Sequence, residues 1–189
     1  MRVLAVALLL CIAWPAAAQD IGITIIEHGI YTAETVRTER LPSGFNTNVV
    51  QNICHVATTE AIPMRRGVQF GFRYRLDGVP AGAVVELTRV TRFPVALKPP
   101  GGPQALSVTQ HQVQMKIGAT SYIGYGFDHD WELVRGPWTL ELWRANQLLA
   151  RQRFEIGDGE PPAERPRSSE NCFQLSVSLP GVARTGGTP

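Results

Sequence analysis

Val68-Gln-Phe-Gly-Phe-Arg-Tyr-Arg-Leu76 is the stretch of sequence that decides the fold class. Apolar residues occupy every second position from Val68 to Leu76, and glutamine, glycine or arginine stands between them. Successive side chains of a strand point to opposite faces of a sheet, so this period of two predicts a strand with one buried face.

Weaker alternation on both sides of this segment predicts seven further strands. They cover residues 21–31, 48–57, 84–91, 106–117, 122–127, 139–144 and 148–156. In two of them the apolar phase moves by one residue, from Leu87 to Val90 and from Val108 to Val113. Such phase changes predict a β-bulge or a break between two strands.

Turn-forming residues separate the predicted strands and leave no room for a long helix. They occur at Leu41-Pro-Ser-Gly44, Asp77-Gly-Val-Pro-Ala-Gly82, Lys98-Pro-Pro-Gly-Gly-Pro103 and Arg135-Gly-Pro137. A short surface turn of helix is an option only for residues 32–40. Each strand must bury one face, so the pattern predicts an all-β, antiparallel β-sandwich, with a small β-barrel as the alternative.

The first eighteen residues have the three parts of a secretory signal peptide. Arg2 precedes an apolar run, and Pro15 is followed by three alanines that end at Ala18. The apolar run is too short to span a bilayer core of about 30 Å as a helix. We therefore expect cleavage after Ala18 and a periplasmic or secreted protein without stable membrane insertion.

Two cysteines, Cys54 and Cys172, remain in the predicted mature chain. An even pair in an oxidising compartment favours a disulfide over two buried thiols. Such a bond would close a loop of more than a hundred residues, which the chain-entropy model values at roughly 4–5 kcal/mol.

The composition changes after Ile156. Residues 158–189 form a Pro/Gly-rich tail whose first part is a predicted flexible linker, and residues 180–189 are predicted to be disordered. Within the tail, residues 172–179 alternate again and predict an extra edge strand, held by Cys172. The expected organisation is therefore a signal peptide at 1–18, a sandwich domain at 19–157 and the tail.

Two segments resemble a bacterial family. The segment from Gly136-Pro-Trp138 to Phe154-Glu-Ile156 looks like the terminal hairpin of bacterial immunoglobulin-like domains. Together with Ile26-Glu-His-Gly-Ile-Tyr31, it resembles the bacterial domain of unknown function 3859 over residues 21–156. The resemblance implies an exported immunoglobulin-like β-sandwich, and it implies no site residues.

No group of residues in the sequence has the spacing of a catalytic or metal-binding motif. Alternation places His129 on the side opposite to Asp128 and Asp130, so the three side chains do not converge without a turn. Cys54 and His55 are neighbours that face opposite ways on a strand, which disfavours a nucleophile and base pair. We therefore predict no catalytic residue, no metal ligand and no cofactor.

Tryptophan supplies the candidate contact residues. Trp138 alternates in step with the apolar residues Leu140 and Leu142, which places it on the buried face of the predicted strand. Trp143 falls on the opposite face, together with Glu141. Exposed tryptophans on a sheet stack on sugar rings or anchor a protein partner. Trp143 is the first candidate for such a contact and Trp131 the second, although both residues are also explained as covers of a sheet edge.

Charge excludes one class of partner. Positive and negative residues are interspersed and the formal net charge is only +2, so no nucleic-acid footprint is present. Arginines 73, 75, 89, 151 and 153 are expected in rows on the outer sheet faces. The sequence favours a non-catalytic interaction module with an envelope protein as partner. A carbohydrate-binding or small-ligand module is the alternative, and a small metal-dependent or hydrolytic enzyme is the third hypothesis.

Overall fold

The structure is a computed structural model that describes residues 20–160, 162, 168 and 171–174. The predicted signal peptide, most of the tail and residues 175–179 of the predicted last strand lie outside these residues.

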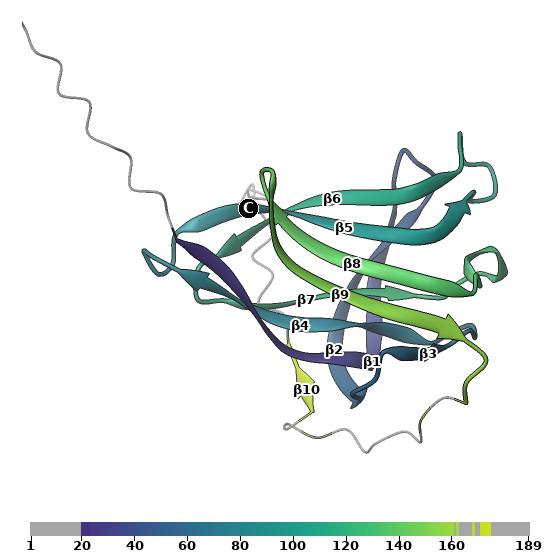
Figure 1. Cartoon of the computed structure of the whole chain (residues 1–189), viewed down its shortest axis with the longest axis horizontal. Coiled ribbons are helices and arrows are strands. Elements are labelled where there is room, and N and C mark those ends of the chain that lie inside the picture. The colour runs from purple at the N-terminus through teal and green to yellow at the C-terminus, as the bar shows by residue number, and fades with distance from the viewer. Residues whose placement is uncertain (1–19, 161, 163–167, 169–170, 175–189) are drawn as a thin grey trace, which may run out of the picture.

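The described residues form ten strands in two open sheets that lie face to face (Figure 1). The first sheet has the order β10-β2-β1-β4-β7 and the second has the order β3-β9-β8-β5-β6. The pairs are antiparallel except for β3 with β9. Neither sheet closes on itself, so the predicted sandwich is confirmed and the barrel alternative is wrong. The strands are β1 (Ile21–Arg40), β2 (Asn46–Ala57), β3 (Ala61–Pro63), β4 (Gln69–Gly78), β5 (Val84–Leu97), β6 (Leu106–Lys116), β7 (Thr120–Gly126), β8 (Gly136–Arg144), β9 (Gln147–Gly157) and β10 (Cys172–Phe173).

The core lies between the sheets and is rich in aromatic rings. The apolar positions of β4 form its centre, because Phe70, Phe72, Tyr74 and Leu76 are all 0% exposed. Trp138 of β8 is also 0% exposed, as its parity predicts, and its ring lies 4.8 Å from that of Phe93. The indole N–H donates to a backbone carbonyl 3.0 Å away, so the buried polar atom is satisfied.

The helical turn that the sequence allowed at 32–40 is wrong. These residues continue β1, and their register with β2 extends to Arg40↔Asn46. Arg40 then donates from Nη2 to the carbonyl of Pro100 at 3.0 Å, which fastens the end of the hairpin. The segment carries little apolar alternation because most of its side chains are exposed, and pairing with β2 rather than burial sets its conformation.

The bulges predicted from the two phase changes are wrong as well. The β5–β6 register runs without a shift from Val84↔Lys116 to Arg92↔Val108. Arg89, expected on an outer face, instead occupies the inward phase and donates from Nη2 to Ser121 Oγ on the facing sheet, 3.2 Å away. The phase change therefore reflects a polar side chain between the sheets.

Two glycines allow an aromatic ring to lie on the outer face of the first sheet. Gly71 and Gly124 are register partners on β4 and β7. A Cβ atom on Gly124 would lie 2.0 Å from the Tyr122 hydroxyl oxygen, and one on Gly71 would lie 2.2 Å from a backbone oxygen. This close approach lets the Tyr122 hydroxyl donate to the carbonyl of Phe70 at 3.3 Å.

We expect Gly124→Ala to displace the Tyr122 ring and to lower the free energy of unfolding by about 1–3 kcal/mol, as overpacking does. Gly22→Ala is the matched control in the same sheet, because a Cβ atom there has nothing within 4 Å. Urea denaturation of both variants measures the difference. An equal effect of the two substitutions would contradict the packing role of Gly124.

Candidate functional site

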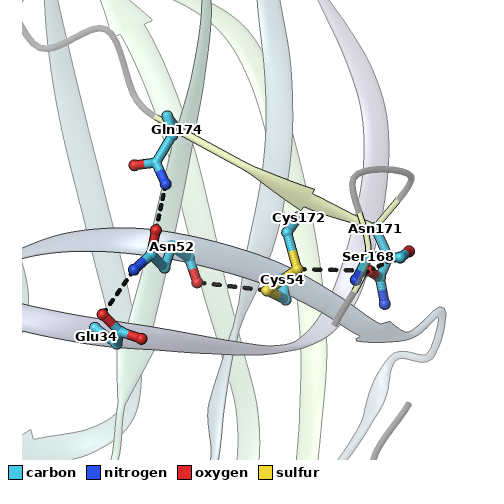
Figure 2. Close-up of a disulfide and its surroundings, with 7 residues drawn as sticks. All are labelled: Glu34, Asn52, Cys54, Ser168, Asn171, Cys172 and Gln174. Atoms are coloured by element: carbon cyan, nitrogen blue, oxygen red, sulfur yellow. Dashed lines mark hydrogen bonds between the residues drawn. A yellow bond between two sulfur atoms is a disulfide. The ribbon is translucent and has the colours of Figure 1, made fainter. Parts of the chain in front are cut away.

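A disulfide fastens the C-terminal segment to the first sheet (Figure 2). It joins Cys54 of β2 to Cys172 of β10 across a sequence separation of 118 residues, so the predicted bond is confirmed. Next to it, Gln174 donates to Asn52, whose side-chain amide donates to Glu34 at 2.7 Å. We call Asn171–Gln174 the strap.

The strap covers a second, smaller core on the outer face of the first sheet. Tyr31, Ile53 and Tyr122 are at most 7% exposed, although they lie on the side opposite to the main core. The Phe173 ring packs against Tyr122 at 6.3 Å, and the Arg73 guanidinium lies 4.8 Å from the centre of the Phe173 ring. The strap therefore removes apolar surface from water and adds a cation–π contact.

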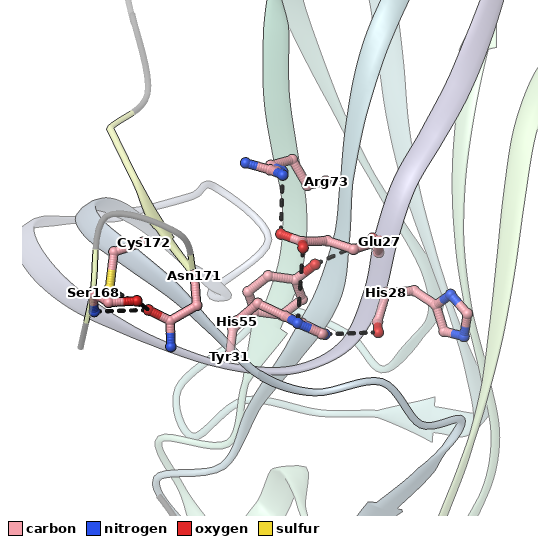
Figure 3. A network of polar contacts seen from close by, with 8 residues as sticks. All are labelled: Glu27, His28, Tyr31, His55, Arg73, Ser168, Asn171 and Cys172. Carbon is pink, nitrogen blue, oxygen red and sulfur yellow. Dashed lines mark hydrogen bonds and ion pairs between the residues drawn. The ribbon is translucent and has the colours of Figure 1, made fainter. Parts of the chain in front are cut away.

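Polar side chains lie beside Tyr31, one of the residues of this small core (Figure 3). The Glu27 carboxylate lies 3.1 Å from Arg73 Nε and 3.8 Å from His55 Nδ1. His55 Nε2 contacts the carbonyl oxygen of His28 at 3.1 Å, and the Tyr31 hydroxyl donates to the carbonyl of Glu27 at 3.1 Å. Burial, and then the negative charge of Glu27, raise the pKa of Tyr31, so its hydroxyl stays protonated.

The chemistry of this cluster favours a structural role. Both nitrogens of the His55 imidazole face protein oxygens, and only 9% of the side chain is exposed. A general base needs a nitrogen that a substrate proton can reach, and the His55 ring is almost fully buried beneath protein atoms. The arrangement holds β1, β2 and β4 together beneath the strap.

The first tryptophan candidate, Trp143, is half-buried on the outer face of the second sheet. Its indole N–H donates to Glu141 Oε2 at 2.8 Å. Arg92 Nε lies 3.1 Å from the same carboxylate, and Arg151 Nε lies 2.9 Å from its other oxygen. We call Arg92, Glu141, Trp143 and Arg151 the guanidinium–indole cluster.

Glu141 is the residue of this cluster that sequence reasoning missed. Its side chain is only 1% exposed although it lies on an outer face, because its three donors cover it. Burial acts to raise the pKa of Glu141, but the hydrogen bonds from Trp143, Arg151 and Arg92 outweigh burial and hold the pKa below its usual value. The available signal was a lone acid flanked by arginines on both neighbouring strands.

The second tryptophan candidate has a different environment. Trp131 belongs to a 3-10 turn (Asp130–Glu132), and its half-buried ring packs edge-on against Phe45 at 5.4 Å. Glu132 accepts hydrogen bonds from two backbone N–H groups and from the Tyr125 hydroxyl. Burial raises the pKa of Glu132, and these hydrogen bonds oppose the shift.

Asp128, His129 and Asp130 do not converge on a common point in this turn. Asp128 accepts a hydrogen bond from Asn48 at 2.9 Å, and the His129 ring stacks on Trp131 at 5.9 Å. Within the described part of the chain, no group of three or more His, Cys, Asp or Glu side chains is placed to hold a metal ion.

β6 forms a long edge of the second sheet. It has 11 residues and pairs with β5 on one side, and no described strand lies on its other side. Ser107-Val-Thr-Gln-His-Gln-Val-Gln114 contains no proline and no carboxylate, lysine or arginine. Burial, and then the charge of Arg89, lower the pKa of His111, so its imidazole is uncharged at neutral pH. We call this free side of Leu106–Lys116 the β6 edge.

We expect Glu141→Gln to cost about 1–2 kcal/mol of stability at neutral pH, because it replaces charge-assisted hydrogen bonds from two half-exposed guanidinium groups with weaker ones. The pKa of Glu141 is lower in the folded than in the unfolded state, so its contribution is present above about pH 4.3 and is lost as the pH falls through the folded-state value. The difference from wild type should therefore shrink in acid.

Glu155→Gln is the control, because this carboxylate is 57% exposed and pairs with exposed Arg153 on the same face. Its loss should cost less than about 1 kcal/mol. Urea denaturation at a series of pH values measures both variants. A Glu141→Gln difference that stays constant down to acid pH would contradict the ion-pair account.

Comparison with solved structures supports the fold. An immunoglobulin-like protein from Pseudomonas aeruginosa matches with 25% identity and a TM-score of 0.51, covering 75% of this chain and 99% of that one. A β-glucosidase from Erythrobacter marinus matches with 10% identity and a TM-score of 0.34, and this chain covers 16% of it. The second likeness is too weak to carry an argument. The sandwich is thus immunoglobulin-like.

The family comparison agrees with the resemblance found in the sequence. No curated protein matches the chain. The family model described as a domain of unknown function (DUF3859) matches residues 19–156, which span the described sandwich from β1 to β9. The chain belongs to the DUF3859 family.

Proposed function

We propose that the protein is an exported, non-catalytic interaction module whose β6 edge pairs with an extended segment of an envelope protein. The observation that carries this proposal is the length of an edge that no other described strand covers. An edge strand offers unpaired backbone N–H and C=O groups, and natural proteins usually protect it with lysine, proline, bulges or a very short strand. The central part of β6 has none of these devices.

Export rests on two observations. The N-terminal sequence has the pattern of a cleaved signal peptide. The Cys54–Cys172 disulfide fits an oxidising compartment. Among the described residues, no helix has the length and apolar character needed to cross a membrane. The periplasm of a Gram-negative cell is the compartment that we propose.

The edge itself indicates what kind of segment it accepts. Met115 and Val113 lie in the inward phase of β6, and Met115 is 8% exposed, so an added strand extends the apolar layer with its own inward side chains. In strand addition the main chain supplies affinity and alternate side chains supply specificity. We therefore expect a partner segment with apolar residues at alternate positions.

Thr109→Lys tests this proposal. Thr109 pairs with Thr91 of β5, and Thr91 pairs with Leu140 of β8, which is buried in the core. The Thr109 side chain therefore lies on the face of the sheet that points toward the core. A lysine there places a charge where the added strand would bury it. We expect at least tenfold weaker binding of the partner, which corresponds to about 1.4 kcal/mol.

The measurement is photo-crosslinking from a benzoylphenylalanine at position 112 in living cells, followed by identification of the adduct. Thr120→Lys is the matched control, because it makes the same exchange at an exposed position on the edge of the other sheet. The adduct should persist in Thr120→Lys and disappear in Thr109→Lys. An adduct that both variants retain, or one formed only between two copies of this chain, would contradict the proposal.

Carbohydrate binding through Trp143 is the second candidate function. The guanidinium–indole cluster favours it, because its carboxylate fixes the orientation of a half-buried indole on an outer sheet face. Trp131 is less suited to this role, since its ring is packed against Phe45.

A further inference from the structure

The two arginines of the guanidinium–indole cluster keep hydrogen-bonding capacity. Both use Nε to contact Glu141, at 3.1 Å from Arg92 and 2.9 Å from Arg151. Their side chains are 46% and 54% exposed, and within the described chain neither guanidinium makes a further hydrogen bond. Their terminal N–H groups are therefore available to a ligand at this surface.

The cluster is preorganised by its buried acid. Glu141 is on β8, which lies between β5 and β9. Its carboxylate accepts hydrogen bonds from the indole N–H of Trp143 and from both arginines at once. Arg92 is on β5, Arg151 is on β9, and Trp143 follows Glu141 by two residues on β8. The rotamers of these long side chains are thus restricted before any ligand arrives, which reduces the entropy lost on binding.

The charge of the cluster selects the ligand. Glu141 compensates one of the two guanidinium charges, which leaves one net positive charge, and the carboxylate itself is hidden from solvent. A guanidinium fork matches the planar geometry of a carboxylate, to which it donates two parallel hydrogen bonds. The face of an indole matches the apolar face of a pyranose ring.

We propose that this surface binds an acidic saccharide, with a uronic acid residue as the recognised unit. Its sugar ring stacks on Trp143, and its carboxylate accepts hydrogen bonds from the terminal nitrogens of both Arg92 and Arg151. The proposal rests on the second candidate function, carbohydrate binding through Trp143, and does not depend on the β6 edge.

Calorimetric titration of the disulfide-bonded protein with oligogalacturonate, oligoglucuronate and oligomannuronate at low ionic strength tests the proposal. We expect at least one acid to bind, with its methyl ester at least tenfold weaker. A phosphorylated oligosaccharide should bind no better than the ester, which distinguishes carboxylate recognition from attraction of any anion.

Variants assign the binding to the cluster. Arg92→Gln and Arg151→Gln should each reduce affinity for the acid by tenfold or more, and Trp143→Ala should remove binding of acid and ester alike. Arg153→Gln is the matched control, because Arg153 is 66% exposed on the same face and pairs with Glu155 instead of Glu141. Thr109→Lys should bind the acid like wild type.

A second measurement needs no substitution. On addition of the bound acid, the indole N–H resonance of Trp143 should shift, whereas that of Trp138, which is 0% exposed, should not. The proposal is overturned if none of the three acids binds, if ester and acid bind equally, or if binding survives in Arg92→Gln and Arg151→Gln. A shift confined to indoles other than Trp143 would also overturn it.

Discussion

Backbone hydrogen bonding at the edges of the two sheets is the constraint on which the rest of the structure depends. Two open sheets have four edges, and each edge leaves N–H and C=O groups to be satisfied. Three of these edge strands are short: β10 has 2 residues, β3 has 3 and β7 has 7. The fourth, β6, has 11 residues, and no described strand pairs with its outer side. β2 and β9 also keep free stretches, because β10 pairs only with Ile53 and Cys54, and β3 pairs only with Glu155, Ile156 and Gly157.

The two outer faces of the sandwich differ in the kind of side chain that they bury. On the first sheet, Tyr31 and Tyr122 need a cover, and the strap supplies one through Phe173 and the disulfide. On the second sheet, the outer face buries a carboxylate instead of aromatic rings, and the donors that compensate it are half exposed. The first face is closed by the chain itself, whereas the second presents oriented polar groups to solvent.

Local alternation was sufficient to predict most of the fold. The strand at β4, the burial of Trp138 and the pairing of Cys54 with Cys172 all follow from parity or from cysteine count, and the structure agrees with them. Residues 32–40 were misread because their conformation depends on pairing with β2 rather than on an apolar face. β3 was missed because three residues are too few to show a period.

The candidate sites were harder to predict, since they depend on side chains that meet across strands. Parity placed Trp143 beside Glu141 correctly, but it gave no sign that Arg92 and Arg151 would bury that acid. The same limit applies to Arg89, whose partner Ser121 is on the other sheet. Sequence-local patterns specify the face of a residue and leave its cross-strand partner open.

Amide hydrogen exchange of the isolated, oxidised protein tests the central claim most directly. In an antiparallel edge strand, only alternate residues direct their N–H groups to the neighbouring strand. The account predicts that amides along Leu106–Lys116 alternate between protected and rapidly exchanging, while the paired amides of β5 are protected. Protection at every position of β6 would contradict it, because the edge would then already be covered.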